Sequence, residues 1–265
     1  MSTIHVFLPQ HSNQATHVMK TNNSEKIKPY HEDEGGKKEQ IRKMFDNIAG
    51  GYDFLNRLLS ARFDVTWRRK LTDKIISHDP TKVLDVATGT GDVAITLAQK
   101  DAQVSIDGTD ISQKMLDIAA KKVAKAQLNE RISLFVEDAE DMSMEDNSYD
   151  VVTASFGVRN FESLEKGLAE MHRVTRPGGY VYILEFSKPR IFPIKQAYNF
   201  YFQNILPLIG RIRSGDPKAY QYLYESVQAF PDGEKFLAKL QEVGFNDVHS
   251  TELTLGICQI YSGKK

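Results

Sequence analysis

Short apolar runs alternate with helical stretches through the middle of the chain, and this alternation predicts the fold class. The runs expected to form strands are 83–87, 103–108, 131–136, 150–155 and 181–186. Between them, apolar residues recur at helical spacing in the segments 93–98, 112–126 and 164–173. Strand, loop and helix repeated in this way are typical of an α/β fold with a parallel sheet that helices cover on both faces. Because the helical crossover between two parallel strands is right-handed, we expect a doubly wound, mostly parallel sheet.

The pattern differs at the start of the chain. Residues 1–36 are polar and have no sustained period, so we expect a mostly disordered tail. Two helices are expected next: one begins at Lys37 and breaks at a pair of glycines, and one spans 64–76 with Asp64 as its cap. A Pro-Gly-Gly at 177–179 is expected to close the last helix of the alternating region.

The regular alternation stops after the fifth expected strand. Residues 189–231 are rich in aromatic residues and prolines, and we interpret them as an insertion that faces a substrate or a membrane. A helix over 232–244 should follow, and then two last strands, 247–254 and 257–261, which pair as a hairpin or flank a bulge. The chain therefore divides into a tail and one domain over 37–265.

The composition excludes several classes of protein. A share of 41% hydrophobic and 26% charged residues is ordinary for a soluble globular protein. A net charge of -1 argues against broad nucleic-acid binding, which needs a clustered basic surface. The seven histidines are scattered without the short spacing of a metal site, so no metal is expected. The single cysteine, Cys258, fits a reducing compartment, where we interpret it as a small buried apolar residue.

Neither a secretory signal nor a spanning helix is expected. The N-terminal segment lacks a continuous apolar core, and no apolar run approaches the roughly 18 residues that a spanning helix needs. We expect a cytoplasmic protein that is free in solution or peripheral at the inner face of the membrane. A homodimer is compatible with the sequence.

The glycine loop after the first expected strand fits two kinds of ligand. VLDVATGTGDVA, residues 83–94, matches G-x-G-x-x-G/A, the turn of dinucleotide-binding folds, through Gly89 and Gly91. Asp110 follows at about the distance where such folds place a ribose-binding carboxylate. Glycine lets a ligand approach the backbone, at the sheet edge where doubly wound folds bind ligands. At this point a nicotinamide dinucleotide and another nucleoside ligand both remain open.

Charge distinguishes the two ligands. A pyrophosphate is bound by backbone N–H groups and a helix N-terminus without a nearby anion. Here Asp85 precedes the loop and Asp92 follows its second glycine, and these two carboxylates would repel a pyrophosphate. They favour a ligand with positive charge, such as S-adenosyl-L-methionine, which carries an ammonium beside a sulfonium and an adenosine at its other end.

Polar residues at the later strand ends agree with this ligand. Asp110 ends the second strand, where a carboxylate can accept from both ribose hydroxyls. Asp138 and Ala139 follow the third strand, where an acid and a backbone N–H can bind adenine. Ser155 ends the fourth strand, beneath the reacting end of the cofactor. Asp92 alone could be an N-terminal helix charge, and Asp138 could be part of a solvated acidic loop. The order of all these polar residues at successive strand ends nevertheless favours S-adenosylmethionine.

Several segments resemble a known family. VLDVATGTGD resembles the first motif of class I S-adenosylmethionine-dependent methyltransferases, which have a Rossmann-like sheet. Three further segments resemble the ubiquinone/menaquinone biosynthesis C-methyltransferase family: MFDNIAGGYDFLN (44–56), SFGVRN (155–160) with HRVTRPGGYVYILEFSKP (172–189), and YQYLYESVQAFPDG (220–233). The resemblance runs from about Lys37 to the C-terminus. It implies an N-terminal helical lid and a C-terminal antiparallel strand.

The resemblance also implies positions and a function. The family's cofactor positions fall on Thr90, Asp110, Asp138, Ala139 and Ser155, and the loop argument adds Gly89, Gly91 and Asp85. The implied reaction is methylation of a prenylated quinol ring, giving menaquinone from demethylmenaquinone or the corresponding ubiquinone intermediate. The N-terminal segment favours the menaquinone route. Two alternatives stay open: a methyltransferase for another lipid-like acceptor, and a cofactor-binding organiser of quinone-pathway proteins without catalysis.

Ring methylation needs groups that act on the acceptor. The ring carbon becomes nucleophilic when the adjacent phenol loses its proton, so a base or a positive partner for the phenolate is expected. Arg159 and Asn160 leave the fourth strand near this point. Arginine stays protonated, so we expect Arg159 to stabilise a phenolate or to orient a water that acts as base. In the lid, Tyr52 is the candidate to hydrogen-bond the quinol and Asp53 the candidate base, with core packing and helix capping as their plain alternatives.

The aromatic insertion is the candidate for contact with lipid. Its apolar residues from Phe192 to Ile209 would cover a prenyl tail, and basic residues flank them: Arg190, Lys195, Arg211 and Arg213. This combination is compatible with binding at a membrane surface. The alternative is an insertion that packs on the sheet.

Overall fold

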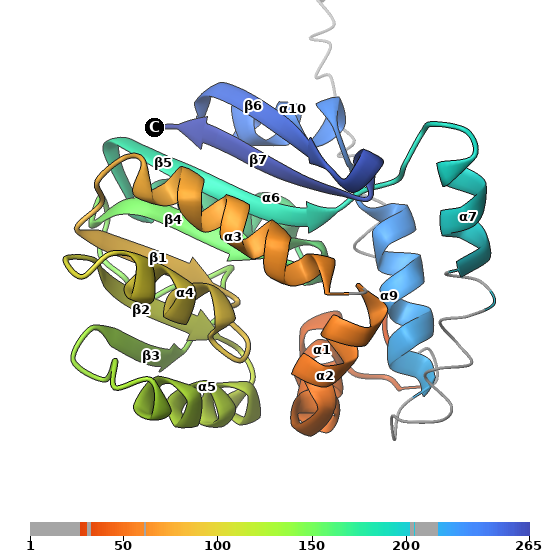
Figure 1. Cartoon of the computed structure of the whole chain (residues 1–265), viewed down its shortest axis with the longest axis horizontal. Helices are drawn as coiled ribbons and strands as arrows, with labels where there is room; N and C mark the ends of the chain where they lie inside the picture. Colours follow the sequence, from red (N-terminus) through yellow and green to blue (C-terminus); the bar gives the residue numbers. More distant parts are fainter. Residues whose placement is uncertain (1–26, 31–32, 61, 202–203, 205–216) are drawn as a thin grey trace, which may run out of the picture.

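The computed structural model describes residues 27–30, 33–60, 62–201, 204 and 217–265, which contain a seven-stranded sheet flanked by helices (Figure 1). The strand order is β3-β2-β1-β4-β5-β7-β6. The strands are β1 Lys82–Val86, β2 Ser105–Asp110, β3 Ile132–Val136, β4 Tyr149–Ser155, β5 Thr175–Phe186, β6 Asn246–Leu253 and β7 Cys258–Lys264. Strands β1 to β5 are parallel, and β7 pairs antiparallel with both β5 and β6. The predicted doubly wound sheet with a C-terminal antiparallel strand is confirmed.

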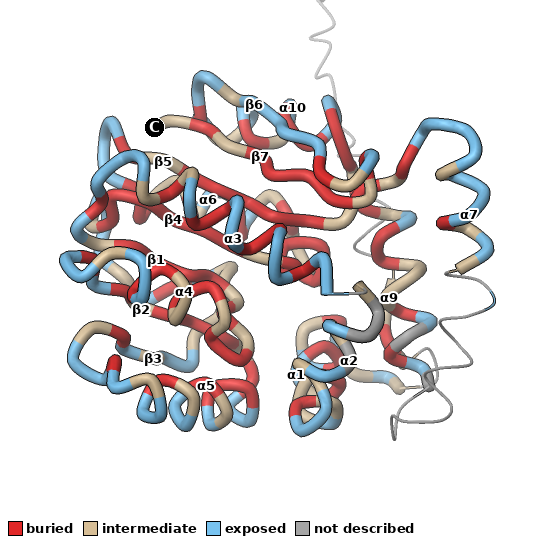
Figure 2. The backbone as a smooth tube through the Cα atoms, viewed as in Figure 1, coloured by how far each residue is buried: buried red, intermediate tan, exposed pale blue. Residues whose placement is uncertain are grey.

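Helices cover both faces of the sheet, as the apolar pattern predicted. One face carries α3 Phe63–Ile76, α4 Asp92–Lys100 and α5 Gln113–Lys125, and the other carries α6 Leu164–Val174 and α10 Glu234–Glu242 (Figure 1). Leu71 and Leu97 are fully buried against the first face, and Leu168 and Phe236 against the second. The central strands β1 and β4 are therefore buried along most of their length (Figure 2), which explains why they read as nearly unbroken apolar runs.

A further group of helices lies beyond the carboxyl ends of the parallel strands (Figure 1). It consists of α1 Lys37–Ile48, the short turn η2 Ala49–Gly51, α2 Tyr52–Leu59, α7 Ile194–Phe200 and α9 Pro217–Ala229. Ile41 of α1 packs with Tyr222 of α9, and Ile27 and Tyr30 pack against the same cluster. Residues 1–26 of the expected tail lie outside the described residues.

Two local expectations are wrong for reasons that lie in tertiary contacts. Asp64 does not cap α3: the N-cap residue is Arg62, and Asp64 lies buried in the first turn, where it accepts a hydrogen bond from Arg68 at 2.6 Å. Pro-Gly-Gly at 177–179 does not close helix α6, which ends at Val174, but lies inside β5. The Gly178 N–H donates to the carbonyl of Lys265 at 2.8 Å, so the chain terminus continues the sheet there.

The aromatic insertion and the lid contain helices that the apolar pattern did not predict. The region of the insertion includes α7 and α9, and α2 begins directly after the glycine pair. The glycines form η2, a tighter helical turn, so the chain continues in helical form across them. Among the described residues, Tyr198 of α7 packs against residues of α9, and Tyr222 of α9 packs with Ile41 of α1.

Candidate active site

A pocket lies at the carboxyl ends of β1, β2, β3 and β4, next to α1 and α2. Its described lining residues include seven that the sequence predicted, from five separate parts of the chain: Tyr52, Gly89, Asp110, Asp138, Ala139, Ser155 and Asn160. This position is typical of a ligand site in an open α/β fold.

Two strand ends enter the pocket through unusual backbone conformations. Ala87, directly after β1, has φ 54°, and Phe156, directly after β4, has φ 59°. Such left-handed conformations in non-glycine residues are costly and cluster at functional sites. Both residues line the pocket. In the loop itself Gly89 and Gly91 also have positive φ, which explains the glycines at these positions.

Asp110 connects the glycine loop to the end of β2. Its carboxylate accepts hydrogen bonds from the backbone N–H groups of Gly89 at 2.9 Å and Ser112 at 2.8 Å. Burial raises the pKa of Asp110 to about 6, although these hydrogen bonds lower it in part. A carboxylate has about four lone-pair positions. Asp110 can therefore hold the loop and still accept hydrogen bonds from a bound sugar.

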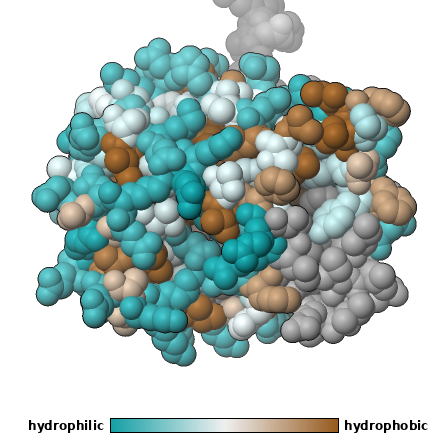
Figure 3. Space-filling view, in the orientation of Figure 1, coloured by the Kyte–Doolittle hydropathy of each residue, from teal (hydrophilic) through white to brown (hydrophobic). Residues whose placement is uncertain are grey.

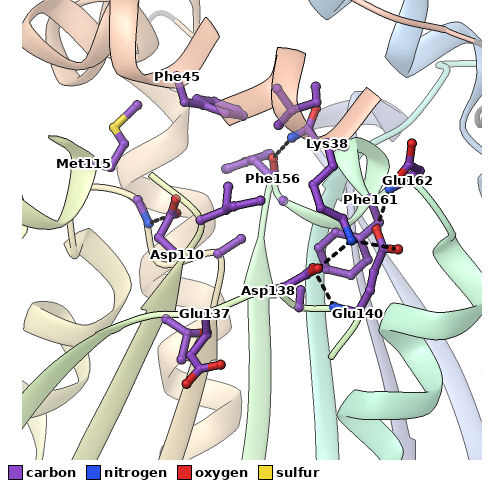
Figure 4. Close-up of a pocket in the computed structure, with 18 of the residues that line it drawn as sticks. Lys38, Phe45, Asp110, Met115, Glu137, Asp138, Glu140, Phe156, Phe161 and Glu162 are labelled. Carbon is purple, nitrogen blue, oxygen red and sulfur yellow. Dashed lines mark hydrogen bonds and ion pairs between the residues drawn. The ribbon is translucent and has the colours of Figure 1, made fainter. Parts of the chain in front are cut away.

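Asp138 is held by a residue that the sequence did not predict. Lys38 of α1 donates to the Asp138 carboxylate and lies 3.7 Å from Glu140 (Figure 4). Asp138 also accepts from the backbone N–H of Glu140 at 3.0 Å. At the base of α1, the buried Lys37 donates to the carbonyl of Phe161 at 2.6 Å. These contacts fasten α1 beside the pocket.

The pocket has an apolar side suited to a flat ring. Aromatic, aliphatic and thioether side chains line it from α1, α5 and the segment after β4: Ile41, Phe45, Met115, Phe156 and Phe161. Figure 4 shows Phe45 and Met115 on one side and Phe161 close to Asp138 and Lys38. Phe156 lies within the SFGVRN motif, so the sequence offered a signal for it. Lys38, Phe45 and Met115 could be located only once the helices were placed over the strand ends.

Charge in the pocket disfavours a dinucleotide, for a reason that differs from the one expected. Among the described lining residues, carboxyl groups outnumber the single base Lys38: Asp110, Glu137, Asp138, Glu140 and Glu162. The Gly89 N–H, a donor that a pyrophosphate would use, is already bound by Asp110.

Asp85 and Asp92, the two carboxylates expected to repel a pyrophosphate, do not line this pocket. Asp92 forms ion pairs with Lys122 and, at 3.5 Å, with Arg68. Asp85 is buried, and one of its oxygens accepts from the Thr88 hydroxyl at 2.6 Å. Burial raises the pKa of Asp85 to about 7. Asp85 and Asp92 are therefore not the carboxylates that face a ligand, and the carboxyl groups that line the pocket disfavour a pyrophosphate instead.

Thr90 and Asp53 bind each other rather than lining the pocket. The Thr90 hydroxyl donates to Asp53 at 2.5 Å, and Lys122 of α5 donates to the other Asp53 oxygen at 2.9 Å. Burial opposes ionisation of Asp53, but the hydrogen bonds from Thr90 and Lys122 outweigh it and lower the pKa. A carboxylate with a lowered pKa and two partners is a weak base. This geometry favours a structural role for Asp53, which connects α2 to the glycine loop.

Tyr52, the neighbour of Asp53, does reach the pocket. Its ring approaches Gly89 and contacts Phe45 edge-on, with 6.0 Å between the ring centroids. Burial raises the pKa of the Tyr52 hydroxyl, so it stays protonated at neutral pH and can donate a hydrogen bond.

Arg159 and Asn160 lie in the short turn η3 Val158–Asn160, just after β4. Asn160 lines the pocket, and the buried Arg159 lies behind it. Arg159 donates to the carboxylate of Glu185 at 2.9 Å, deep at the end of β5. Glu185 was not predicted, although it belongs to the LEFSKP segment. Burial raises the pKa of Glu185, while the Arg159 guanidinium opposes the rise.

The ubiE/COQ5 methyltransferase family matches residues 33–265. The chain belongs to this family. It is 45% identical over 241 residues to a protein of Bacteroides fragilis named demethylmenaquinone methyltransferase, covering 91% of this chain and 98% of that protein. It is 46% identical over 230 residues to a Geotalea daltonii protein named ubiquinone/menaquinone biosynthesis C-methyltransferase UbiE, covering 86% of this chain and 97% of that protein.

Solved structures show the same fold. A putative S-adenosylmethionine-dependent methyltransferase from Methanococcus maripaludis aligns with TM-score 0.58 and 21% identity, over 83% of this chain and 94% of that one. A methyltransferase from Thermotoga maritima, described as a possible histamine N-methyltransferase, aligns with TM-score 0.61 and 16% identity, over 85% of this chain and 99% of that one. At these identities the likeness shows the fold alone.

Proposed function

We propose that this enzyme transfers the methyl group of S-adenosyl-L-methionine to a ring carbon of a prenylated quinol, converting demethylmenaquinol to menaquinol. The observation that carries the proposal is the 45% identity to a demethylmenaquinone methyltransferase across 91% of the chain. That stretch includes all the lining residues of a pocket that suits an adenosyl group and disfavours a pyrophosphate.

The pocket residues suit the separate parts of the methyl donor. Asp110 accepts hydrogen bonds from the ribose hydroxyls, and Asp138 and Ala139 bind the adenine edge. The adenine ring packs among Met115, Phe161 and the other apolar lining residues. Gly89 and Ser155 lie toward the reacting end. When bound, S-adenosylmethionine supplies an electrophilic methyl group bonded to a sulfonium.

The chain's own residues would prepare the acceptor for this transfer. A guanidinium remains protonated at all relevant pH values, so Arg159 stabilises a phenolate electrostatically. Asn160 holds the acceptor hydroxyl or a water that takes its proton. Tyr52 donates a hydrogen bond from the lid, and α1 and α2 exclude water from the site. Alignment of two reactants in this way can supply roughly 7–11 kcal/mol of barrier lowering.

A second acceptor has support of its own. The relatives from Geotalea species carry the ubiquinone/menaquinone name at 45–46% identity, so methylation of the corresponding ubiquinone intermediate is the alternative. Both acceptors carry a lipid tail.

The tail of such an acceptor suggests contact with a membrane surface. Ile191 and Phe192, which precede α7, are 57% and 76% exposed. Figure 3 shows apolar side chains gathered over the region of α7. Within the described part of the chain, no helix has the length and apolar character needed to cross a bilayer. We propose a cytoplasmic protein that binds peripherally at the inner membrane face, where its acceptor resides.

Lipid quinones from a strain that lacks this gene test the proposed acceptor. Demethylmenaquinone should accumulate and menaquinone should disappear, and the wild-type gene should restore the normal ratio. Accumulation of the unmethylated ubiquinone intermediate alone would favour the alternative acceptor. Unchanged levels of both quinones would contradict the proposal.

A further inference from the structure

Four buried polar atoms, three of them in the segment 155–160 after β4 and one on α9, lack a hydrogen-bond partner among the described residues. They are Ser155 Oγ, Arg159 Nε, Asn160 Oδ1 and Tyr222 Oη. Arg159, Asn160 and Tyr222 are only 8%, 7% and 2% exposed. Buried polar groups are nearly always hydrogen-bonded, and each exception calls for an explanation. Ser155 and Asn160 line the pocket itself, which points to a ligand as the partner.

Arg159 is held in place while its buried Nε–H stays without a partner among the described residues. Its Nη1 donates to the carbonyl of Phe156 and to Glu185, and its guanidinium lies 5.5 Å from the ring centroid of Phe186. Glu185 is in turn fixed by the backbone N–H of Phe186 at 2.8 Å. The Nε–H is therefore a rigid donor without a protein acceptor.

Tyr222 approaches the same place from α9. This helix contacts η3, and Tyr222 packs on Ile41, which lines the pocket. The Tyr222 hydroxyl lies within electrostatic range of both Arg159 and Glu185. Burial raises its pKa, so the hydroxyl keeps its proton and can donate. The YQYLYESVQAFPDG segment thus brings a second donor beside Arg159.

We propose that Tyr222 binds the acceptor: its hydroxyl and the Arg159 Nε–H donate to one ring oxygen of the quinol, and Asn160 Oδ1 accepts from that oxygen while it is protonated. This inference rests on the proposed function and adds an acceptor-binding residue to it. A ring hydroxyl donates a hydrogen bond and needs an acceptor, whereas the phenolate formed from it only accepts and needs hydrogen-bond donors. Three of the four unpartnered atoms meet this need: Asn160 Oδ1 is the acceptor, and Arg159 Nε and Tyr222 Oη are the donors. The proton that leaves the ring oxygen passes to a water next to Asn160.

The variant that tests this inference is Tyr222→Phe, which removes one oxygen and keeps the ring that packs on α1. Tyr149→Phe is the matched control, because the Tyr149 hydroxyl donates to Asp107 at 2.8 Å at the opposite end of β4. Both full-length variants are assayed with S-adenosylmethionine and reduced short-chain demethylmenaquinol. We expect kcat/KM for the quinol to fall at least about tenfold in Tyr222→Phe, since it loses a donor to the developing phenolate. Cofactor affinity should stay within about twofold in both variants, and the control should keep its kcat/KM.

A binding measurement separates this inference from the proposed function. 1,4-Naphthalenediol and its dimethyl ether are compared as ligands by calorimetry in the presence of S-adenosylhomocysteine. The wild type should bind the diol more tightly, and Tyr222→Phe should lose most of this preference. If the wild type methylates no quinol yet shows this pattern, the proposed acceptor is wrong and Tyr222 still binds a ring hydroxyl. An unchanged preference, an unchanged kcat/KM, or an equal loss of cofactor affinity would each overturn the role of Tyr222.

Discussion

Asp85 and Asp110 lie on the adjacent strands β1 and β2, and both are buried beneath the glycine loop. Burial is the main cause that raises their pKa values, to about 7 for Asp85 and about 6 for Asp110. The charge of Asp110 raises the pKa of Asp85 further. Asp110 has two backbone N–H partners, whereas one oxygen of Asp85 has no partner among the described residues. Asp85 is thus the residue with the clearest conflict between charge and burial.

The pKa of Asp85 predicts a pH dependence of stability. The folded pKa of about 7 lies above the ordinary 3.8, so its contribution is fully present below about pH 4 and is lost as pH rises through about 7. The difference corresponds to at most about 4 kcal/mol. Asp85→Asn, which can still accept from Thr88, should therefore gain stability relative to wild type as pH rises from 5 to 8. Urea unfolding at both pH values measures this, with the exposed Asp117→Asn as control. Parallel curves for wild type and Asp85→Asn would contradict it.

The pair Arg159–Glu185 determines how the role of Arg159 can be tested. Arg159→Ala alone leaves Glu185 buried without its partner, and breaking a buried pair costs about 3–5 kcal/mol. The double variant Arg159→Gln/Glu185→Gln removes both charges and keeps similar volumes. We expect it to bind cofactor normally while its turnover falls by roughly 100-fold or more. Isothermal titration and steady-state kinetics measure the two effects. Turnover close to wild type would contradict a role of Arg159 in stabilising the phenolate.

At the residue scale, the sequence located the part of the site that follows from strand order. Asp110 and Ser155 end β2 and β4, and Asp138 closely follows β3, so the parallel sheet brings all three to one edge. Lys38 and Glu185 could not be predicted in the same way. Lys38 reaches Asp138 only because α1 lies beside the pocket, and Glu185 becomes relevant only through its bond to Arg159.

At the scale of elements, one cluster joins the lid to the cofactor loop. Asp53 of α2 binds Thr90 in the loop and Lys122 of α5, and Lys122 also pairs with Asp92 at the start of α4. Ser112 Oγ, at the cap of α5, donates to Asp46 of α1 at 2.6 Å. Among the described residues, these polar contacts attach α1 and α2 to the glycine loop and to α5, and we expect these two helices to open more easily than the core helices.

Asp53→Ala should loosen this attachment. It removes two hydrogen bonds to α2, one of them charged, so local opening of residues 52–59 should become roughly tenfold or more frequent. Hydrogen exchange with mass spectrometry measures it, and the KM for S-adenosylmethionine should rise. Asp73→Ala, which removes an ion pair between α3 and Lys100, is the control and should leave the lid unchanged. If exchange in α2 does not change, Asp53 does not hold the lid.

The helices that pack on the sheet were predictable from the apolar pattern, as was α1, whereas α2, α7 and α9 were not. The sheet-covering helices α4, α5, α6 and α10 have one apolar stripe facing a flat core, which gives a clear period. Helix α9 instead buries Tyr222 against α1, and it buries Val227 outside that cluster. Its many aromatic residues obscure the helical spacing of apolar positions. Tertiary contacts, not local pattern, decide such helices.

At the scale of the whole molecule, the lid helices, the pocket and the exposed residues before α7 all lie beyond the carboxyl ends of the strands (Figure 1). The proposed membrane contact uses this end of the molecule, where Ile191 and Phe192 are exposed. In that proposal the sheet and its helices stay in water while the tail of the acceptor stays in the bilayer.

Membrane binding should depend on these exposed residues. The double variant Ile191→Ser/Phe192→Ser removes two apolar side chains, each worth about 1.5–3 kcal/mol when fully buried, so binding to anionic vesicles should weaken at least about tenfold. Co-sedimentation with phosphatidylglycerol vesicles measures this. Phe135→Ser is the control, since Phe135 is also exposed but lies on the edge strand β3. Absence of vesicle binding by the wild type would exclude the membrane-surface contact.

The most direct test of quinol methylation by this protein is a methyl-transfer assay with the purified full-length chain. The protein is incubated with S-adenosylmethionine labelled in the methyl group and with reduced demethylmenaquinone of short prenyl length, and the lipid product is identified by mass spectrometry. We expect labelled menaquinone with the methyl group on the ring carbon, formed together with one S-adenosylhomocysteine in each catalytic cycle. Label on a ring oxygen, or no labelled quinone while another lipid acceptor is methylated, would contradict it.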